Sequence, residues 1–267
     1  MENKLVEKLE KGIPVIGLNN SCPAANIVER MCRGWDFVWI DAQHGQHSYE
    51  SVLNAIRAAG TIGIDTVLRV PGHEYGILGP YADTASSAIM VPMVDTRQQA
   101  ADIVDALRFP PLGKRSYGGR RMIDMYGRSY FKDRKLLVIA QIETLEAVEN
   151  VDEIIGTDGI DMIFFGPDDM KVRMDIDIDA PVFGNEQLLG AMKSVAKAAK
   201  SAGKYAGCVA ASPDILNVSY DMGYRLFMCG GDMGFIRSAA DKRLSEIRGA
   251  LEKREFVEIR DTKDTVY

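Results

Sequence analysis

Two acidic side chains are spaced to bind a divalent cation. Glu143 directly follows the apolar run 136–142, and Asp169 lies shortly after the apolar run 161–165. Two carboxylates, completed by water and substrate oxygens, form the usual ligand set for Mg2+ or Mn2+. Each residue also lies just before a stretch with helical spacing, so a pair of helix N-caps is the alternative interpretation. The pattern predicts an oxygen-ligand metal site and leaves the capping role open.

A histidine and an arginine follow two other apolar runs. His44 comes three residues after Asp41, the last residue of the run 37–41, and a carboxylate at this spacing can orient an imidazole that acts as a general base. Arg69 lies near the end of the run 65–70 and can bind a substrate carboxylate or a developing enolate oxygen. The alternatives are a loop histidine bonded to backbone and a structural ion pair between Arg69 and Asp41.

The remaining reactive side chains argue against several common enzyme classes. We expect His47 to be a solvent-facing loop residue, and Cys208 and Cys229 to be strand-wall thiols rather than nucleophiles. The sequence contains no GxSxG, Walker or HExxH motif, which removes the common hydrolase, NTPase and zincin interpretations. No lysine stands at a predicted strand end in a position for a Schiff base, so a class I aldolase is disfavoured.

A regular alternation of elements must position these side chains. Short runs rich in β-branched and aromatic residues recur along the chain, and most are continuously apolar, as in parallel strands buried on both faces. We expect strands at 15–19, 37–41, 65–70, 89–93, 136–142, 161–165, 205–209 and 225–229. Helix-period stretches lie between them, for example at 95–107, 145–156, 186–202 and 213–223.

Eight strands that alternate with helices predict an α/β protein with a (β/α)8 TIM barrel. An open doubly wound sheet is the alternative, but no GxGxxG follows the first strand. In a barrel, the carboxyl ends of the strands bear the chemistry, and the candidate residues Asp41, His44, Arg69, Glu143 and Asp169 all lie at or shortly after such ends. A length of 267 residues suits one barrel, so we expect a single catalytic domain over 1–250 and a charged tail over 251–267, either frayed or lying on another subunit.

Charge and cysteine usage limit the partners and the compartment. The 32 basic and 38 acidic residues give a net charge of −6, which speaks against nucleic acid or an anionic membrane surface as the main partner. No apolar run approaches the roughly 20 residues of a membrane span, and the N-terminus has no apolar signal core. Four cysteines without a CxxC pair are typical of reduced thiols, so we expect a cytoplasmic protein.

Six segments taken together resemble one enzyme family. They are, in chain order, DFVWIDAQHG, VLRVP, MVPMVDTRQQA, RFPPLGKRSYGG, AQIETLEAVENVDEI and GIDMIFFGPDDM. They are similar to the HpcH/HpaI family of metal-dependent (class II) pyruvate aldolases, and the match runs from about residue 12 to residue 250. The QIET and GPxD segments are specific only in combination.

The resemblance implies a (β/α)8 barrel, a hexamer built from dimers that exchange a C-terminal helix, and a divalent metal (Mg2+, Mn2+ or Co2+). It implies reversible cleavage of 4-hydroxy-2-oxo acids to pyruvate and an aldehyde, so the partners are a small 2-oxo acid, an aldehyde and further copies of this chain. By position, His44 matches the general base and Arg69 the residue that stabilises the enolate. Gln141 matches a contact to the pyruvate moiety, and Glu143 and Asp169 match the metal ligands.

Three further positions come from the resemblance alone. The backbone at Asp168, after Gly166, matches a site for the substrate carboxylate, which suits the N-terminus of a helix. Asp83 matches an acidic residue that raises the basicity of the histidine. It precedes the fourth strand and therefore lies at the wrong end for its own barrel mouth, so we expect it to act across a subunit interface.

The sequence departs from the family pattern at three places. Gln43 stands where the family commonly has a glutamate, which removes one negative charge near the metal and supplies an amide. Asp168 stands where a small residue is usual, and we expect its side chain to turn outward. Polar Asn19 and Asn20 end the first strand, which suggests a more polar aldehyde pocket.

The departure at Gln43 keeps two other functions in consideration. One is citrate-synthase-like or decarboxylative carbon–carbon bond formation that uses oxaloacetate on the same scaffold. The other is a non-catalytic binding protein, which should lack the base, the arginine or a metal ligand. Because none of these positions is lost, the aldolase is the preferred prediction.

Overall fold

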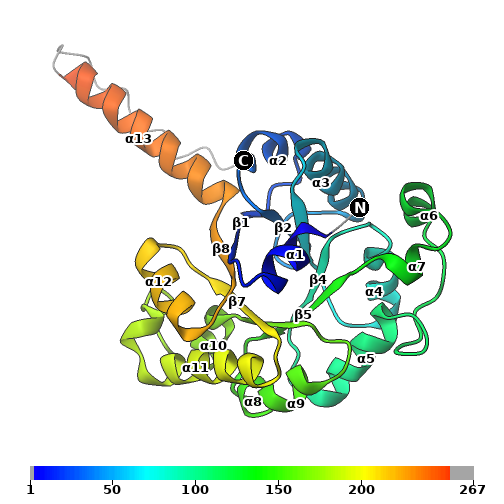
Figure 1. Ribbon diagram of the computed structural model, residues 1–267. Helices are drawn as coiled ribbons and strands as arrows, with labels where there is room; N and C mark the ends of the chain where they lie inside the picture. The colour runs from blue at the N-terminus through cyan, green and yellow to red at the C-terminus, as the bar shows by residue number, and fades with distance from the viewer. Residues whose placement is uncertain (1–2, 253–267) are drawn as a thin grey trace. The chain divides into compact units, whose positions relative to one another are not determined.

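The computed structural model describes residues 3–252 and contains a closed barrel of eight parallel strands in chain order (Figure 1). The strands are β1 (Val15–Asn20), β2 (Phe37–Asp41), β3 (Asp65–Arg69), β4 (Ala88–Val91), β5 (Leu137–Ile142), β6 (Met162–Phe165), β7 (Tyr205–Val209) and β8 (Leu226–Gly231). Parallel pairing of β1 with β8 closes the barrel. The predicted (β/α)8 fold is confirmed.

Helices precede, connect and follow the strands. They are α1 (Lys4–Glu10), α2 (Ala25–Met31), α3 (Tyr49–Ile62), α4 (Tyr75–Ala82), α5 (Arg97–Leu107), α6 (Arg120–Tyr126), α7 (Tyr130–Asp133), α8 (Leu145–Glu149), α9 (Val151–Gly156), α10 (Pro167–Arg173), α11 (Glu186–Ser201), α12 (Pro213–Met222) and α13 (Asp232–Glu252), with a short 3-10 helix η1 (Val182–Gly184). The helix expected over 145–156 is two helices that meet at Asn150, which ends α8 and begins α9. Ser212 caps α12 through the backbone N–H of Ile215, as the Ser-Pro start predicts.

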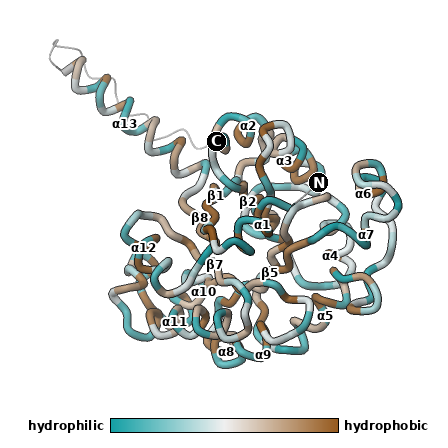
Figure 2. Tube along the Cα trace, viewed as in Figure 1, coloured by the Kyte–Doolittle hydropathy of each residue, from teal (hydrophilic) through white to brown (hydrophobic). Residues whose placement is uncertain are grey.

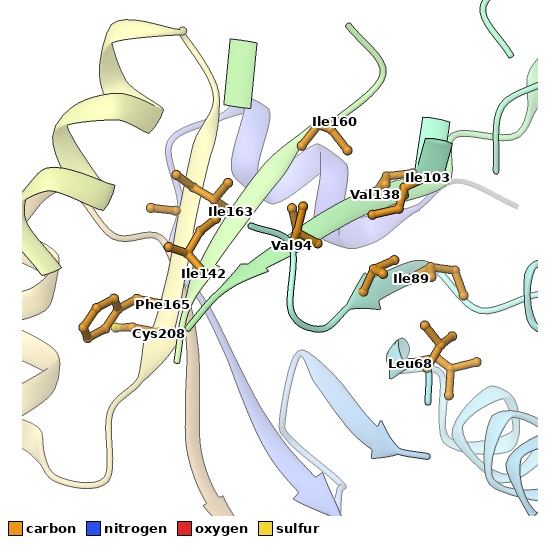
Figure 3. Packing of buried hydrophobic residues seen from close by; sticks show 14 of the residues in the cluster. Leu68, Ile89, Val94, Ile103, Val138, Ile142, Ile160, Ile163, Phe165 and Cys208 are labelled. Atoms are coloured by element: carbon orange, nitrogen blue, oxygen red, sulfur yellow. The ribbon is translucent and has the colours of Figure 1, made fainter. Parts of the chain in front are cut away.

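Two apolar layers hold the barrel together. The outer layer lies between strands and helices, and Figure 3 shows Leu68, Val138 and Ile163 in it, with Ile103 of α5 beside Val138. Its members alternate with a second set of side chains that point into the barrel. Burial on both faces explains why the strands are continuously apolar, and Figure 2 shows this concentration of hydrophobic residues along the strands.

Glycines make room for the aromatic side chains of the inner layer. A Cβ placed on Gly17 would lie 2.2 Å from the ring of Phe37. A Cβ on Gly207 would lie 2.8 Å from the ring of Phe164. Both rings are fully buried, so a methyl group at either glycine would have to displace a ring in a close-packed interior. The two glycines are therefore needed for space and not for backbone conformation.

The described chain divides into two compact units between Asp232 and Met233. The first unit is the barrel. The second unit is described as α13 from Met233 onward, and its described part exposes the large apolar residues Met233, Phe235, Ile236, Leu244, Ile247 and Leu251. The expected charged tail over 251–267 lies, apart from its first two residues, outside the described residues. No helix among residues 3–252 is long and apolar enough to cross a membrane.

Gly207→Ala is expected to lower the free energy of unfolding by about 1–3 kcal/mol, because Phe164 and Leu226 must shift to admit the methyl group. Urea denaturation measures the change. Gly190→Ala is the matched control, since nothing lies within 4 Å of a Cβ at this exposed position in α11. There, alanine should raise stability by about 0.5–1 kcal/mol. Equal effects of the two substitutions would contradict the packing argument.

Candidate active site

The strand register brings five of the predicted residues to the carboxyl end of the barrel. Asp41 ends β2 and Arg69 ends β3, and the two are paired in the register. Gln141 is the second-last residue of β5, Glu143 directly follows β5, and Gly166 directly follows β6. Because the carboxyl ends of parallel strands meet at one rim, these residues share the barrel mouth.

Arg69 and Asp41 form a side-on ion pair. Arg69 Nε donates to Asp41 Oδ1 at 3.0 Å, and Nη2 donates to Oδ2 at 2.7 Å. The side chains are 12% and 5% exposed, respectively. Burial alone would raise the pKa of Asp41, but the hydrogen bonds and charge of Arg69, helped by two backbone N–H groups, bring this pKa below its ordinary value. Asp41 is therefore a fixed anion, and the ion pair considered for Arg69 is present.

Asp41 contacts the His44 loop through the backbone. Its Oδ1 accepts the backbone N–H groups of Gln43 at 3.1 Å and His44 at 3.2 Å. The His44 side chain is exposed, and among residues 3–252 its ring has no hydrogen bond to Asp41. The spacing of three residues thus allows a backbone contact at the start of the loop, and the imidazole remains available to a substrate.

His47 was predicted to face solvent, but it is half-buried. Its Nε2 lies 3.1 Å from the backbone oxygen of Asn20, and its Nδ1 lies 3.1 Å from Ser51 Oγ. Because a carbonyl oxygen only accepts, Nε2 must donate in this contact. Burial lowers the pKa of His47, and the hydrogen bond to Asn20 opposes this shift. His47 therefore ties the loop after β2 to the end of β1.

Glu143 is a buried carboxylate at the opposite side of the mouth. It is 1% exposed, and its Oε1 accepts the backbone N–H of Met93 at 2.8 Å. Burial raises the pKa of Glu143 to about 7; the Met93 hydrogen bond opposes the shift, and the nearby charge of Asp169 adds to it. A buried carboxyl group whose pKa is raised further by a neighbouring negative charge is a combination that a bound cation relieves.

The helix-cap alternative for these two carboxylates is wrong. Thr144 caps α8, because its Oγ1 accepts the backbone N–H of Ala147 at 3.0 Å. Gly166 occupies the N-cap position of α10, and Asp169 lies inside its first turn. Neither Glu143 nor Asp169 is therefore used as a cap.

Gly166 packs closely against Gln141 and Glu143. A Cβ on Gly166 would lie 2.9 Å from Gln141 Nε2 and 3.1 Å from Glu143 Oε2. Gln141 is 3% exposed, and its Oε1 is buried with no hydrogen-bond partner in the part of the chain that the structure describes. An unsatisfied buried acceptor next to a carboxylate indicates a place for a donor or a ligand that the protein itself does not supply.

The residues present fit a divalent ion with few protein ligands. Glu143 and Asp169 are oxygen donors whose repulsion a cation would remove. Within residues 3–252, no group of three or more His, Cys, Asp or Glu side chains is arranged to hold a metal ion. Water and substrate oxygens would have to complete the shell, as is common for Mg2+.

Two of the predicted site residues lie away from this cluster. Asp168 points outward, as expected: its side chain is 74% exposed, and Lys171 Nζ approaches it at 3.3 Å. Asp83 ends α4, pairs with Arg115 at 2.6 Å, and lines a cavity of about 550 Å3 whose lining includes none of the mouth residues. The described chain therefore does not bring its own Asp83 to its own His44.

The positions that depart from the family pattern are polar and partly unsatisfied. Gln43 Oε1 is buried and has no hydrogen-bond partner within residues 3–252. Asn20 is buried and donates to Asp232 Oδ2 at 2.8 Å, whereas half-buried Asn19 accepts from Ser21 Oγ at 2.6 Å. Asn20 thus belongs to the framework, and Asn19 is the one of the pair with exposed surface.

The sequence did not point to two residues that shape the mouth. Met93 has a positive φ of 54°, a strained conformation for a residue with a side chain, and its N–H binds Glu143. Trp39 lies under Arg69, with the guanidinium carbon 5.2 Å from its ring centre. Only the alternation of inward residues along β2 could have indicated Trp39, and nothing local predicts the Met93 backbone.

The chain has clear relatives among known proteins. A family model described as HpcH/HpaI aldolase/citrate lyase matches residues 20–239. The 2-keto-3-deoxy-L-rhamnonate aldolase of Escherichia coli (strain K12) is 28% identical over 251 residues, which is 92% of this chain and 93% of the relative.

Solved structures agree with this match. An HpcH/HpaI aldolase/citrate lyase family protein from Burkholderia cenocepacia J2315 is 28% identical, with a TM-score of 0.83 over 92% of this chain and 100% of that one. The citrate synthase SbnG is 25% identical, with a TM-score of 0.83 over 94% and 100% of the two chains. Because the matched segment begins at the end of β1 and includes every mouth residue described above, the chain belongs to the HpcH/HpaI aldolase/citrate lyase family of enzymes.

Proposed function

We propose that the protein is a divalent-metal-dependent aldolase, a carbon–carbon lyase that reversibly cleaves a 4-hydroxy-2-oxo acid into pyruvate and an aldehyde. The observation that supports this most is that one barrel mouth contains two acidic side chains on one side and a fixed positive charge on the other. Glu143 and Asp169 form an uncompensated acidic pair, while Arg69 is a positive charge held rigidly by Asp41. A 2-oxo acid that becomes an enolate needs both a cation and a fixed positive donor.

A divalent ion bound by Glu143 and Asp169 would supply Lewis acidity toward the oxo and carboxylate oxygens of the substrate. An oxygen-ligand site of this kind accepts Mg2+, Mn2+ or Co2+. Gln141, the backbone at Gly166 and the backbone N–H of Asp168 in the first turn of α10 would bind and orient the acid moiety.

The chain's own groups then divide the proton and charge transfers. His44, whose ring is exposed at the mouth, takes the proton from the 4-hydroxyl group as the C3–C4 bond breaks. Arg69 donates hydrogen bonds to Asp41 from Nε and Nη2, so Nη1 remains to stabilise the enolate oxygen. In the condensing direction the same groups remove a methyl proton from pyruvate.

We further propose that the working form is a cytoplasmic homo-oligomer in which Asp83 of one subunit serves the His44 of another. The 550 Å3 cavity that Asp83 lines supports this, because it lies outside the mouth and is rimmed by polar side chains. The apolar residues along α13, exposed in the single chain, support assembly with further copies, as an exchanged helix would provide.

The aldehyde is expected to be polar. Asn19 and Ser21 stand together at the end of β1, where an amide and a hydroxyl can bind a hydroxyl group of the aldehyde. The Escherichia coli relative is a 2-keto-3-deoxy-L-rhamnonate aldolase, which acts on a polyhydroxylated acid by its name. A hydroxyaldehyde is therefore the first class to test.

A second function on the same scaffold is favoured by Gln43 and by the likeness to the citrate synthase SbnG. The amide in place of a carboxylate lowers the negative charge at the mouth, which suits a more highly charged acid such as oxaloacetate. Assays with oxaloacetate as donor or substrate separate the two. Turnover of 4-hydroxy-2-oxo acids without turnover of oxaloacetate would reject the second function.

Removal of the metal is expected to abolish pyruvate release. A retro-aldol screen of 4-hydroxy-2-oxo acids with coupled pyruvate detection should lose at least about 100-fold in rate with a chelator, and added Mg2+ or Mn2+ should restore it. Glu143→Ala should show the same loss without restoration. Glu146→Ala, which removes an exposed carboxylate on α8, is the control and should keep the rate. Pyruvate release that persists in Glu143→Ala or without metal would refute the proposal.

Complementation between subunits tests the role of Asp83. His44→Ala and Asp83→Asn should each be nearly inactive alone, whereas co-expression should recover about one quarter of the wild-type rate, because that share of interfaces pairs two intact residues. His44→Ala mixed with Arg69→Ala is the control, since both belong to one mouth and no intact site can form. Absence of recovery in the first mixture would place the role of Asp83 within its own chain or remove it.

A further inference from the structure

The layer directly beneath the mouth contains a tryptophan that touches the site arginine. Trp39 belongs to the inward face of β2, two residues before Asp41, and is 3% exposed. The guanidinium carbon of Arg69 lies 5.2 Å from the centre of its ring. Arg69 therefore meets a carboxylate along one edge and an aromatic face beneath it.

These two contacts restrain different motions of the guanidinium. The side-on bonds to Asp41 fix the position of Nε and Nη2, yet they leave the group free to tilt about the line that joins them. The indole face beneath resists that tilt, since a desolvated cation is attracted to the face of a tryptophan more than to any other side chain ring. Together they determine where Nη1 points.

The indole is itself held in place by packing across the barrel. Phe164 of β6 meets it edge to face, with ring centres 4.9 Å apart and an interplanar angle of 89°. Phe164 in turn occupies the space that Gly207 leaves on β7, where a Cβ would lie 2.8 Å from its ring. Contacts through four strands thus connect the inner packing to the position of Arg69.

Apolar filling alone does not account for a tryptophan here. The indole Nε1 is buried and has no hydrogen-bond partner among residues 3–252. Phenylalanine or leucine would fill the layer without leaving a buried donor unpaired, which is unfavourable in a dry interior. What tryptophan adds is the strongest face for a cation, and the one cation over that face is Arg69 in the described chain.

We propose that Trp39 is a positioning residue for Arg69, which sets the tilt of the guanidinium so that Nη1 meets the developing enolate oxygen. This inference rests on the proposed aldolase function for its chemical consequence. Trp39 itself need not touch the substrate, because it lies beneath Arg69 and has almost no exposed surface.

The first experiment measures enolisation alone. Exchange of the pyruvate methyl protons in D2O, with Mn2+ present and no aldehyde, gives kcat and KM by NMR. Trp39→Leu should lower kcat about tenfold with KM changed less than about twofold, and Trp39→Phe, which keeps an aromatic face, should recover most of the rate. A loss in Trp39→Phe as large as in Trp39→Leu would overturn the inference, because the ring face would not be what matters.

Phe37→Leu is the matched control. Phe37 is on the same strand and the same inward face, is fully buried in the same cluster, and contacts the Gly17 side of the barrel. It should lower the melting temperature at least as much as Trp39→Leu while the exchange rate stays within about twofold of wild type. Equal losses of kcat in Phe37→Leu and Trp39→Leu would reduce Trp39 to a core residue and overturn the inference.

A second measurement needs no turnover. The Nε–H resonance of Arg69, assigned by its disappearance in Arg69→Lys, should exchange slowly with solvent in the wild type and in Phe37→Leu, and faster in Trp39→Leu. If wild-type protein fails to exchange pyruvate while this coupling holds, the proposed function falls and the positioning stands. If pyruvate exchanges but the resonance behaves identically in all variants, the positioning falls and the function stands.

Discussion

At the barrel mouth, the carboxylate of Asp41 binds three groups at once: the guanidinium of Arg69 and the backbone N–H groups of Gln43 and His44. The register that pairs Asp41 with Arg69 on adjacent strands makes this possible, because it places the two side chains on the same rim. A buried ion pair contributes little net stability, but removal of one partner leaves a buried charge unpaired. The candidate base loop and the candidate enolate donor therefore depend on a single anion.

The same mouth contains carboxyl groups whose pKa values are shifted in opposite directions. Hydrogen bonds and the charge of Arg69 lower the pKa of Asp41, whereas burial and the charge of Asp169 raise the pKa of Glu143 to about 7. One carboxylate is already compensated by the protein, and the other pair is not. This asymmetry supports the proposal that a cation would bind on the side of β5 and β6 and that the fixed donor lies on β2 and β3, because groups with divergent environments take different roles.

The fold was predictable because each parallel strand is buried on both faces and so appears as an apolar run with chemistry at its end. Details that depend on backbone direction were not. The spacing from Asp41 to His44 indicated a side-chain contact, but the short loop turns the backbone N–H toward the carboxylate. Thr144 and Gly166 occupy the N-cap positions of α8 and α10, because each directly precedes its helix. The positive φ of Met93 arises from a loop whose shape no local pattern encodes.

Close packing against Gln141 and Glu143, and not the path of the chain, requires glycine at position 166. Its φ of −110° and ψ of 99° lie in the extended region that any residue adopts, so conformation does not require glycine there. Space does, because a Cβ would press on Gln141 Nε2 and Glu143 Oε2. In a close-packed interior, the buried, unpaired Oε1 of Gln141 and the raised pKa of Glu143 are both unfavourable unless a ligand supplies a donor or a positive charge. In the inner layer below the mouth, the space beside Gly17 and Gly207 is filled by the buried rings of Phe37 and Phe164, so the barrel is closely packed there.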